Sequence, residues 1–234
     1  MLAAGLPASL RFSVLPPENR ALTPIYNEPM SGPIISALPL EFPRDISREH
    51  MAALPVRRYE GEVVLVASPK DFDRAWEDLA QETAVGWDTE TRPAFKVGES
   101  YLPSLVQAAT ARAVYLFQLA KMDFSPVIGG LFAEPTIVKP GISVADDLRK
   151  LKQVFHFEDE SVIDLGTVAK RHGMEQTGLR NLAGIFLGFR VAKGTKTTNW
   201  AAPRLTEQQV NYAATDAWAC RELYLKFKEL GMVD

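Results

Sequence analysis

Apolar and polar positions alternate in short, regular runs from about residue 59 to the end of the chain. Apolar runs at residues 63–67, 84–88, 104–110 and 113–117 are bounded by turn-forming residues, a pattern typical of buried strands. The last three runs follow one another closely in the sequence. We therefore predict four strands, of which the last three form an antiparallel meander.

Helical signals lie between and after these runs. Ser68 followed by Pro69 has the form of an N-cap with proline at the first helical position, which predicts a helix to about residue 82. Thr206 and Gln209 have capping-box spacing, which predicts a long last helix to about residue 230. We also predict a short strand at 136–139 and helices at 124–132, 144–155, 165–172 and 179–187. Early strands and late helices indicate an α/β domain with a mixed sheet.

The first 58 residues lack this periodicity. They hold nine of the sixteen prolines of the chain, and proline interrupts helices and central strands because its ring fixes φ and its nitrogen carries no hydrogen. We expect residues 1–58 to form an irregular, proline-rich N-terminal arm that either wraps the domain or stays mobile. Residues 59–234 then form the domain proper, and the arm is a possible site for protein partners, whose identity the sequence does not indicate.

Composition narrows the class of protein. A hydrophobic content of 47% with 24% charged residues is ordinary for a soluble domain, and no apolar run approaches membrane-spanning length. The first residues lack a convincing signal peptide, so we expect a cytoplasmic protein with no membrane association. A net charge of -3 argues against a broad basic face for long nucleic acid, but it allows an enzyme that holds a strand end.

The run at 84–88 ends in two acids, Asp88 and Glu90. Side chains alternate along a strand, so both carboxylates point the same way and repel each other. Burial makes that repulsion costly, and a hard divalent cation such as Mg²⁺ or Mn²⁺ relieves it better than a lysine because it accepts several oxygen ligands. Asp-x-Glu is also common in solvated turns, so the pattern becomes informative where other acids converge on it.

Two later stretches supply further acids. Tyr212 and Asp216 are four residues apart in the predicted last helix and share one face, although an ordinary amphipathic helix has the same pattern. Asp146 and Asp147 fall in the first turn of the helix predicted at 144–155, after a Pro-Gly turn. Acids in a first turn also suit the helix dipole, so a structural role remains open for this pair.

Together the three stretches resemble the DEDD superfamily of 3′-5′ exonucleases, in the tyrosine-containing (DEDDy) subgroup to which RNase D and the Werner-syndrome exonuclease domain belong. The residues that match the three motifs are, in order, Asp88 with Glu90, Asp147, and Tyr212 with Asp216. At the second motif, the spacing to the following Leu-Arg-Lys-Leu run selects Asp147 over Asp146. The resemblance covers about residues 60–230 and implies a ribonuclease H-like fold, a mixed β-sheet flanked by helices.

The resemblance also implies a mechanism, which is hydrolysis of phosphodiester bonds from the 3′ end of single-stranded RNA or DNA with two divalent metal ions. Asp88 would bridge the two ions, and Asp147 would hold the second ion through water. Glu90 and Asp216 would complete the first site. Tyr212 would orient the attacking water, because a phenol with an ordinary pKa near 10 is a poor general base.

Substrate contacts carry weaker signals. The candidates for phosphate contacts, chosen for closeness to the motifs, are Lys193, Lys196 and Arg149, and those for the terminal bases are Thr89 with Phe95 or Tyr101. Solvated charge and plain packing remain alternatives for these residues.

Two other functions stay open. One is a catalytically silent nucleic-acid-binding or scaffold member of the fold, although such relatives usually lose an acid and this chain retains all of them. The other is a phosphodiesterase for short oligonucleotides, which the modest charge allows. RNA and DNA are not distinguished, because every expected contact is to metal, phosphate or base faces and none is to a 2′-hydroxyl.

Overall fold

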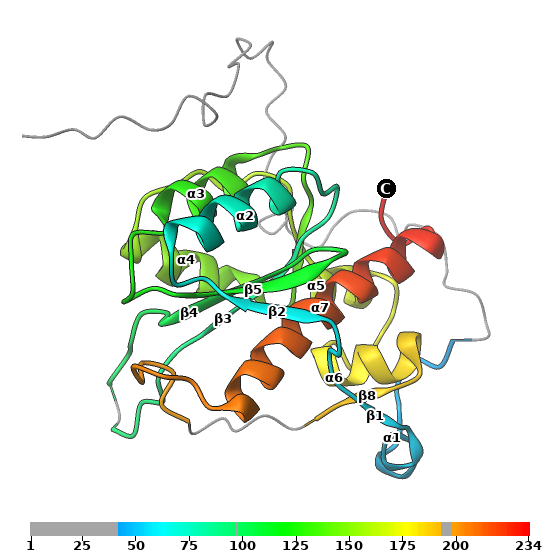
Figure 1. Cartoon of the computed structure of the whole chain (residues 1–234). Coiled ribbons are helices and arrows are strands. Elements are labelled where there is room, and N and C mark those ends of the chain that lie inside the picture. The colour runs from blue at the N-terminus through cyan, green and yellow to red at the C-terminus, as the bar shows by residue number, and fades with distance from the viewer. Residues whose placement is uncertain (1–41, 97, 193–197) are drawn as a thin grey trace, which may run out of the picture.

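The computed structural model describes residues 42–96, 98–192 and 198–234, which form a central sheet with helices on both sides (Figure 1). The elements in chain order are α1 (Arg48–Ala53), β1 (Val56–Arg57), β2 (Glu62–Leu65), α2 (Pro69–Leu79), β3 (Gly86–Glu90), β4 (Leu105–Ala109), β5 (Ala113–Gln118), α3 (Ser125–Ala133), β6 (Lys139–Gly141), α4 (Val144–Val154), β7 (Val162–Asp164), α5 (Leu165–Arg171), α6 (Leu179–Leu182), a π-helical turn (Ala183–Leu187), β8 (Arg190–Val191) and α7 (Glu207–Glu229). None of the described helices combines the length and the apolarity that a bilayer crossing requires.

The central sheet is mixed, with strand order β2-β5-β4-β3. β3 pairs antiparallel with β4 and β4 antiparallel with β5, which confirms the predicted meander, while β2 lies parallel to β5. Beyond β3, a bridge between Ala84 and Val138 leads to the parallel pair β6 and β7. This ribonuclease H-like arrangement confirms the predicted fold class.

Alternation along the strands sends side chains to two separate cores. Trp87, Tyr115 and Phe117 pack in the cluster that includes α2, α3 and α4. Leu105 and Leu116 point to the opposite face and pack on α7. Because Trp87 faces the α2 side, its neighbours Asp88 and Gly86 face α7.

Small residues let α7 approach β3 closely. Gly86 is needed at its position, since a Cβ there would lie 2.1 Å from the carbonyl oxygen of Ala217 and 2.6 Å from the nitrogen of Arg221. Ala213 and Ala217 are fully buried against the sheet. The helix begins at the predicted capping box, in which Thr206 and Gln209 exchange hydrogen bonds. This approach brings Asp216, on α7, down to the carboxylates of β3.

The segment from residue 42 to 58 is more regular than the sequence predicts. No proline lies between Pro43 and Pro55, and Ser47 caps the short helix α1. β1 then pairs parallel with β8. The described part of the expected arm therefore contains a helix and a strand that lie against the domain, while residues 1–41 lie outside the described residues. A domain boundary at residue 59 stays a prediction.

Other differences from the prediction are local. The helix expected at 179–187 consists of α6 and a π-helical turn that ends at Gly188, whose φ is 69°. The strand expected at 136–139 is β6, which begins at Lys139. β1, β7 and β8 have two or three residues each, too few for alternation to reveal them in the sequence.

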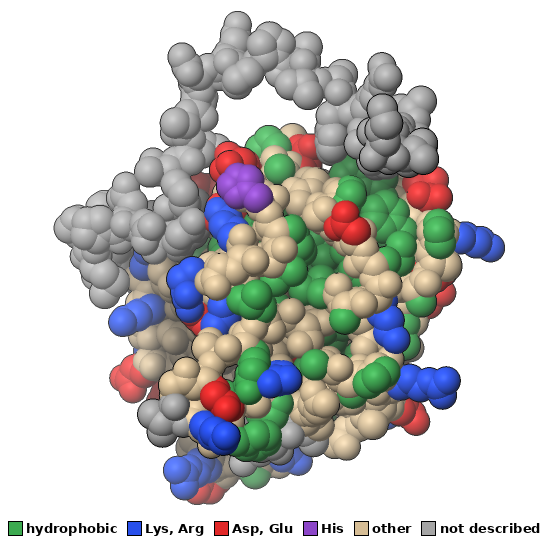
Figure 2. Space-filling model, turned by 90° about the vertical axis from the view of Figure 1, so that its left-hand side faces the viewer, with side chains coloured by type: hydrophobic (Ala, Val, Ile, Leu, Met, Phe, Trp, Pro, Cys, Tyr) green, Lys and Arg blue, Asp and Glu red, His purple; other side chains and the backbone are tan. Residues whose placement is uncertain are grey.

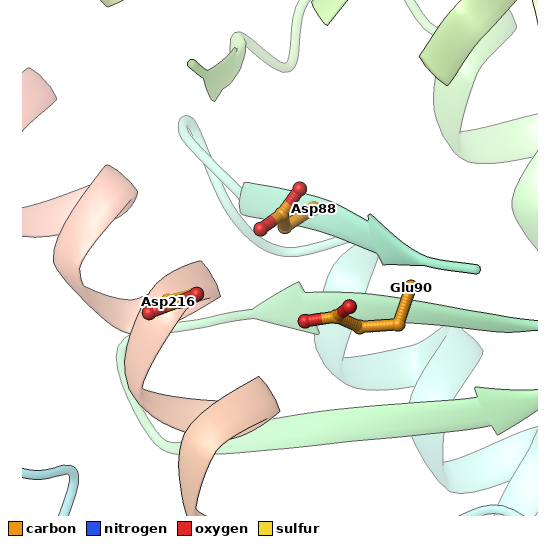
Figure 3. Close-up of side chains that lie close together, drawn as sticks. All are labelled: Asp88, Glu90 and Asp216. Atoms are coloured by element: carbon orange, nitrogen blue, oxygen red, sulfur yellow. The ribbon is translucent and has the colours of Figure 1, made fainter. Parts of the chain in front are cut away.

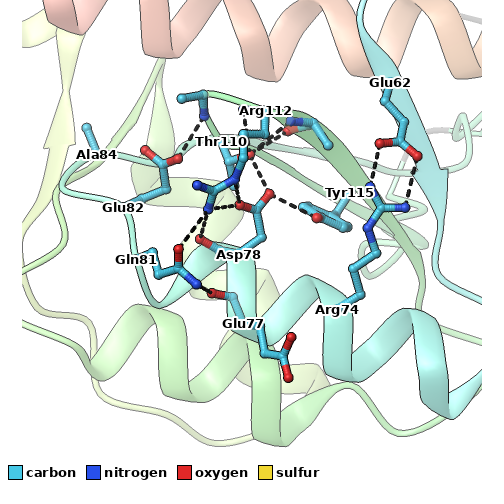
Figure 4. A network of polar contacts seen from close by, with 12 residues as sticks. Glu62, Arg74, Glu77, Asp78, Gln81, Glu82, Ala84, Thr110, Arg112 and Tyr115 are labelled. Atoms are coloured by element: carbon cyan, nitrogen blue, oxygen red, sulfur yellow. Dashed lines mark hydrogen bonds and ion pairs between the residues drawn. The ribbon is translucent and has the colours of Figure 1, made fainter.

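A buried polar network joins α2 to the hairpin between β4 and β5 (Figure 4). Asp78, only 7% exposed, lies at its centre. The hydroxyls of Tyr115 and Thr110 donate to its carboxylate at 2.9 and 2.8 Å, and Arg112 forms an ion pair with it. Each oxygen of this buried carboxylate therefore has a partner from the protein.

Candidate active site

Three carboxylates converge where α7 crosses the end of β3. Asp88 and Glu90 project from β3 toward Asp216 on α7, and Figure 3 shows the three side chains facing a common point. One oxygen from each carboxylate lies within 4.8 Å of the others. Strand alternation and the close approach of α7 thus bring together acids that are more than 120 positions apart in the sequence.

The electrostatics of this three-acid cluster are unfavourable as long as all three groups are ionised. Burial, followed by the charges of Asp216 and Asp147, raises the pKa of Glu90 to about 8. Burial raises the pKa of Asp216 to about 7. The pKa of Asp88 lies well above its ordinary value, mainly because the group is buried and then because of its acidic neighbours. Near neutral pH the cluster must therefore take up protons or a cation.

The donor set fits a hard divalent cation. It consists entirely of carboxylate oxygens, which Mg²⁺ and Mn²⁺ prefer. Oδ1 of Asp216 is buried and has no hydrogen-bond partner among the described residues. Within the same part of the chain, no lysine or arginine forms an ion pair with any of the three acids. A buried oxygen without a partner among these residues is unusual in a folded protein, and a bound cation would satisfy it.

Asp147 lies beside the cluster rather than within it. It falls in the first turn of α4, which follows Ser143 in a left-handed conformation with φ of 59°. The Thr89 hydroxyl donates to Asp147 Oδ1 at 2.5 Å, and the Thr89 amide donates to Asp88 Oδ1 at 2.8 Å. Burial raises the pKa of Asp147. Thr89, predicted as a substrate contact, is 8% exposed and links the acids of β3 and α4.

Tyr212 lies one helical turn before Asp216 on the same face of α7. Its hydroxyl hydrogen-bonds the Asp216 carboxylate, which lowers the pKa of Asp216. Burial and the charge of Asp216 raise the pKa of Tyr212 above its ordinary value. Tyr212 therefore keeps its proton and acts as a hydrogen-bond donor next to the carboxylates.

A model of the 3′-5′ exonuclease family matches residues 63–231. The chain belongs to this family. The matched region contains all three predicted motifs, and the relatives of the chain include ribonuclease D and the Werner exonuclease. The prediction of a DEDD-type 3′-5′ exonuclease is thereby confirmed at the level of the enzyme family.

Individual relatives agree with the assignment to 3′-5′ exonucleases. The bifunctional 3′-5′ exonuclease and ATP-dependent helicase WRN of Mus musculus is 30% identical over 76% of this chain and 13% of its own length. Ribonuclease D of Haemophilus influenzae is 34% identical over 62% of this chain and 36% of its own. The Nibbler EXO domain of Aedes aegypti has the same fold, with a TM-score of 0.66, 22% identity and coverage of 76% of this chain and 92% of its own. The chain thus spans well under half the length of the two curated relatives.

The residues predicted to contact phosphates or terminal bases stay predictions. Lys193 and Lys196 lie outside the described residues. Arg149 is exposed on α4, in an ion pair with Asp146. Phe95 is 78% exposed, whereas the ring of Tyr101 lies 3.6 Å from the Arg92 guanidinium. None of these side chains forms part of the three-acid cluster.

Sequence reasoning missed two features of the site. Gln107 pairs with Asp88 in the β3–β4 register and is fully buried, and its side-chain amide has no partner among the described residues. Its signal was a polar residue in an otherwise apolar run. Arg57 and Arg58 line a hollow against Tyr212, and nothing in their local sequence indicates that position.

Proposed function

We propose that this chain hydrolyses phosphodiester bonds from the 3′ end of single-stranded nucleic acid, using two divalent metal ions. The observation that carries the proposal is the convergence of three carboxylates within 4.8 Å around a buried oxygen that lacks a partner. Membership of the 3′-5′ exonuclease family supports the same reaction.

The acids divide into two groups by position. Asp88, Glu90 and Asp216 would hold one ion, and Asp147 on α4, together with Asp88, would hold the second. Bound ions would acidify the attacking water and offset charge on the attacking and leaving oxygens. The Thr89 hydroxyl positions Asp147 for this role. Mg²⁺ and Mn²⁺ both suit the oxygen donors.

Tyr212 positions the attacking water in this proposal. Its raised pKa makes proton abstraction by the phenolate unfavourable near neutral pH. Its hydroxyl already contacts Asp216 and so lies at the edge of the cluster. From there its oxygen accepts a hydrogen bond from the attacking water and so orients that water toward the scissile phosphate.

Single-stranded nucleic acid is the substrate that the charge distribution favours. On the face shown in Figure 2, Lys and Arg side chains are spread among acidic and apolar ones rather than gathered in one broad patch. This spread and the net charge of -3 suit a site that holds one strand end. The RNase D of Trypanosoma brucei, which shares the fold at a TM-score of 0.62 and 18% identity, was solved in complex with RNA U12. A cytoplasmic location is part of the same proposal and rests on the sequence alone.

The decisive test is degradation of 5′-labelled single-stranded RNA and DNA 12-mers with Mg²⁺, Mn²⁺ or EDTA. We expect a ladder that shortens from the 3′ end, requires metal and disappears in Asp88→Ala. The exposed neighbour of Asp147 provides a matched pair, since Asp147→Ala should lose the ladder and Asp146→Ala should keep it. Absence of a ladder on both polymers with either metal would contradict the proposal and favour a catalytically silent binding module.

A length series tests the alternative of a short-oligonucleotide phosphodiesterase. The purified chain is given labelled oligomers from two to twelve nucleotides under the same conditions. Rates that are sustained on the longer oligomers support the exonuclease. Rates confined to two to four nucleotides would identify the short-oligonucleotide enzyme instead.

A further inference from the structure

A hollow of about 540 Å³ has Tyr212 in its lining, and the Tyr212 hydroxyl hydrogen-bonds Asp216 of the three-acid cluster. One wall is the first half of α7, which contributes Asn211, Tyr212 and Thr215, and the other comes from the strand pair β1 and β8. Its volume is in the range of cavities that hold nucleotide-sized ligands. Tyr212 is thus shared between the candidate active site and this hollow.

The segment from β1 to Tyr59 is held against α7 and β8 by specific contacts. β1 pairs with β8 in parallel register. Immediately after β1, the backbone N–H of Tyr59 donates to Thr215 Oγ1 at 3.0 Å. The Thr215 hydroxyl in turn donates to the backbone oxygen of Asn211 at 2.6 Å. These contacts fix Arg57 and Arg58 beside the face of α7 that carries Tyr212.

The two arginines give the hollow a net positive lining. Both are exposed, and neither forms an ion pair with an acid among the described residues. The Arg57 guanidinium lies 6.0 Å from the centre of the Phe189 ring. Among the described residues, Glu207 is the one acid of the lining. Arginine presents a planar set of donors that matches phosphate oxygens.

We infer that this hollow binds the nucleotides on the 5′ side of the scissile bond, with Arg57 and Arg58 on their phosphates. The inference rests on the proposed function. At a 3′ hydroxyl end, the departing nucleotide carries no phosphate besides the scissile one, which the acids and their metal ions serve. All further phosphates of the strand lie on the 5′ side. The guanidinium groups of Arg57 and Arg58 next to Tyr212 can therefore contact phosphates only on that side. The segment that carries Arg57 and Arg58 is therefore part of the substrate site.

The first test measures binding without turnover. The full chain is added to 5′-fluorescein-labelled dT12 in EDTA, and the fluorescence anisotropy is measured at salt concentrations from about 50 to about 200 mM. Loss of two phosphate contacts in Arg57→Gln/Arg58→Gln should weaken binding about tenfold at 50 mM salt and reduce the slope of log Kd against log salt by about 1.4. Arg57→Lys/Arg58→Lys keeps both charges and should keep most of the slope, which a merely structural role would not predict.

A matched control lies in the same segment. Arg48, exposed on α1, is not part of the lining, so Arg48→Gln should bind dT12 as the unchanged chain does. Thermal unfolding of each variant identifies any that fail to fold. A folded Arg57→Gln/Arg58→Gln chain with unchanged affinity and salt slope would overturn the inference.

The second test separates this inference from the proposed function. With Mg²⁺, hydrolysis of dT12 is compared with hydrolysis of the p-nitrophenyl ester of thymidine 5′-monophosphate, which has no nucleotide on the 5′ side. The double glutamine variant should lose at least about fivefold more kcat/KM on dT12 than on the ester. Equal losses on both substrates would contradict the inference. If the unchanged chain hydrolyses neither substrate, the proposed function fails, while the salt dependence in EDTA still decides whether the hollow binds phosphate.

Discussion

Two buried aspartates, Asp78 and Asp216, have similar surroundings and opposite electrostatic situations. Their exposures are 7% and 4%, and each accepts a hydrogen bond from a tyrosine hydroxyl, Tyr115 for Asp78 and Tyr212 for Asp216. Asp78 also has Arg112 as an ion-pair partner. Asp216 instead has an oxygen with no partner among the described residues and two further carboxylates beside it.

The difference distinguishes a buried acid that stabilises the fold, Asp78, from a buried acid whose arrangement suits ligand binding, Asp216. At Asp78 the protein itself supplies the partners that offset the cost of burying charge. At Asp216 that cost remains, because the compensating charge is expected from outside the chain. A cluster of this kind lowers the stability of the metal-free protein in exchange for function.

The largest expected effect is on catalysis. Under the proposed function, Asp216→Asn removes a charge that would hold a metal ion and should lower kcat by about a thousandfold or more with Mg²⁺, since metal-assisted water activation would be lost. Asp78→Asn alters a buried network of similar chemistry away from the cluster and should stay within about threefold of the unchanged rate at 20 °C. Initial rates on dT12 or its RNA counterpart measure both. Equal losses in the two folded variants would contradict the division of roles.

The next effect is on stability. Asp78→Ala leaves Arg112, Tyr115 and Thr110 without their acceptor and should lower the free energy of unfolding by about 3 kcal/mol. Asp216→Asn, measured in EDTA, should instead raise it by about 1 kcal/mol because a repelling buried charge is gone. Urea denaturation followed by circular dichroism determines both values. A loss of stability in Asp216→Asn would show that the acid cluster is not under strain without metal.

The parts of this site that sequence patterns reveal are those with local signals. Asp88 and Glu90 follow an apolar run, Tyr212 and Asp216 have helical spacing, and Thr206 begins α7 with a capping box. Each pattern depends on residues a few positions apart, so it can be recognised in a single sequence.

Features that depend on distant partners could not be predicted this way. Gly86 is needed because the backbone of α7 at Ala217 passes directly over it. Arg57 lines the hollow beside Tyr212 because β1 pairs with β8. Neither contact leaves a periodic trace, since strands of two residues are too short to alternate. The proline content of the first 58 residues also concealed α1, which fits into the interval between Pro43 and Pro55.

The two tyrosines offer a smaller and sharper comparison. Tyr212→Phe should lower kcat about tenfold or more while leaving Mg²⁺ affinity within about twofold, because the role we propose for the hydroxyl is to orient water and not to bind metal. Tyr115→Phe should leave kcat unchanged and lower the free energy of unfolding by about 1 kcal/mol through its lost bond to Asp78. Turnover, calorimetric titration with Mg²⁺ and urea denaturation distinguish the two. A parallel loss of metal affinity in Tyr212→Phe would assign this residue to the metal site itself.

The smallest effect is the pH dependence of stability in EDTA. Glu90 and Asp216 have folded-state pKa values of about 8 and 7, above their ordinary values, so between about pH 5 and 8 the folded chain binds more protons than the unfolded chain. At low pH these carboxyl groups are protonated and the cluster destabilises the fold least. As the pH rises through the folded-state pKa values, the groups ionise and the fold loses stability. We expect the free energy of unfolding to fall as the pH rises from 5 to 8. Saturating Mg²⁺ should flatten the profile, because it compensates the ionised carboxylates, and Asp216→Asn in EDTA should reduce the slope. A profile that is equally steep with and without Mg²⁺ would place the titrating groups elsewhere in the chain and remove the electrostatic contrast between Asp78 and Asp216.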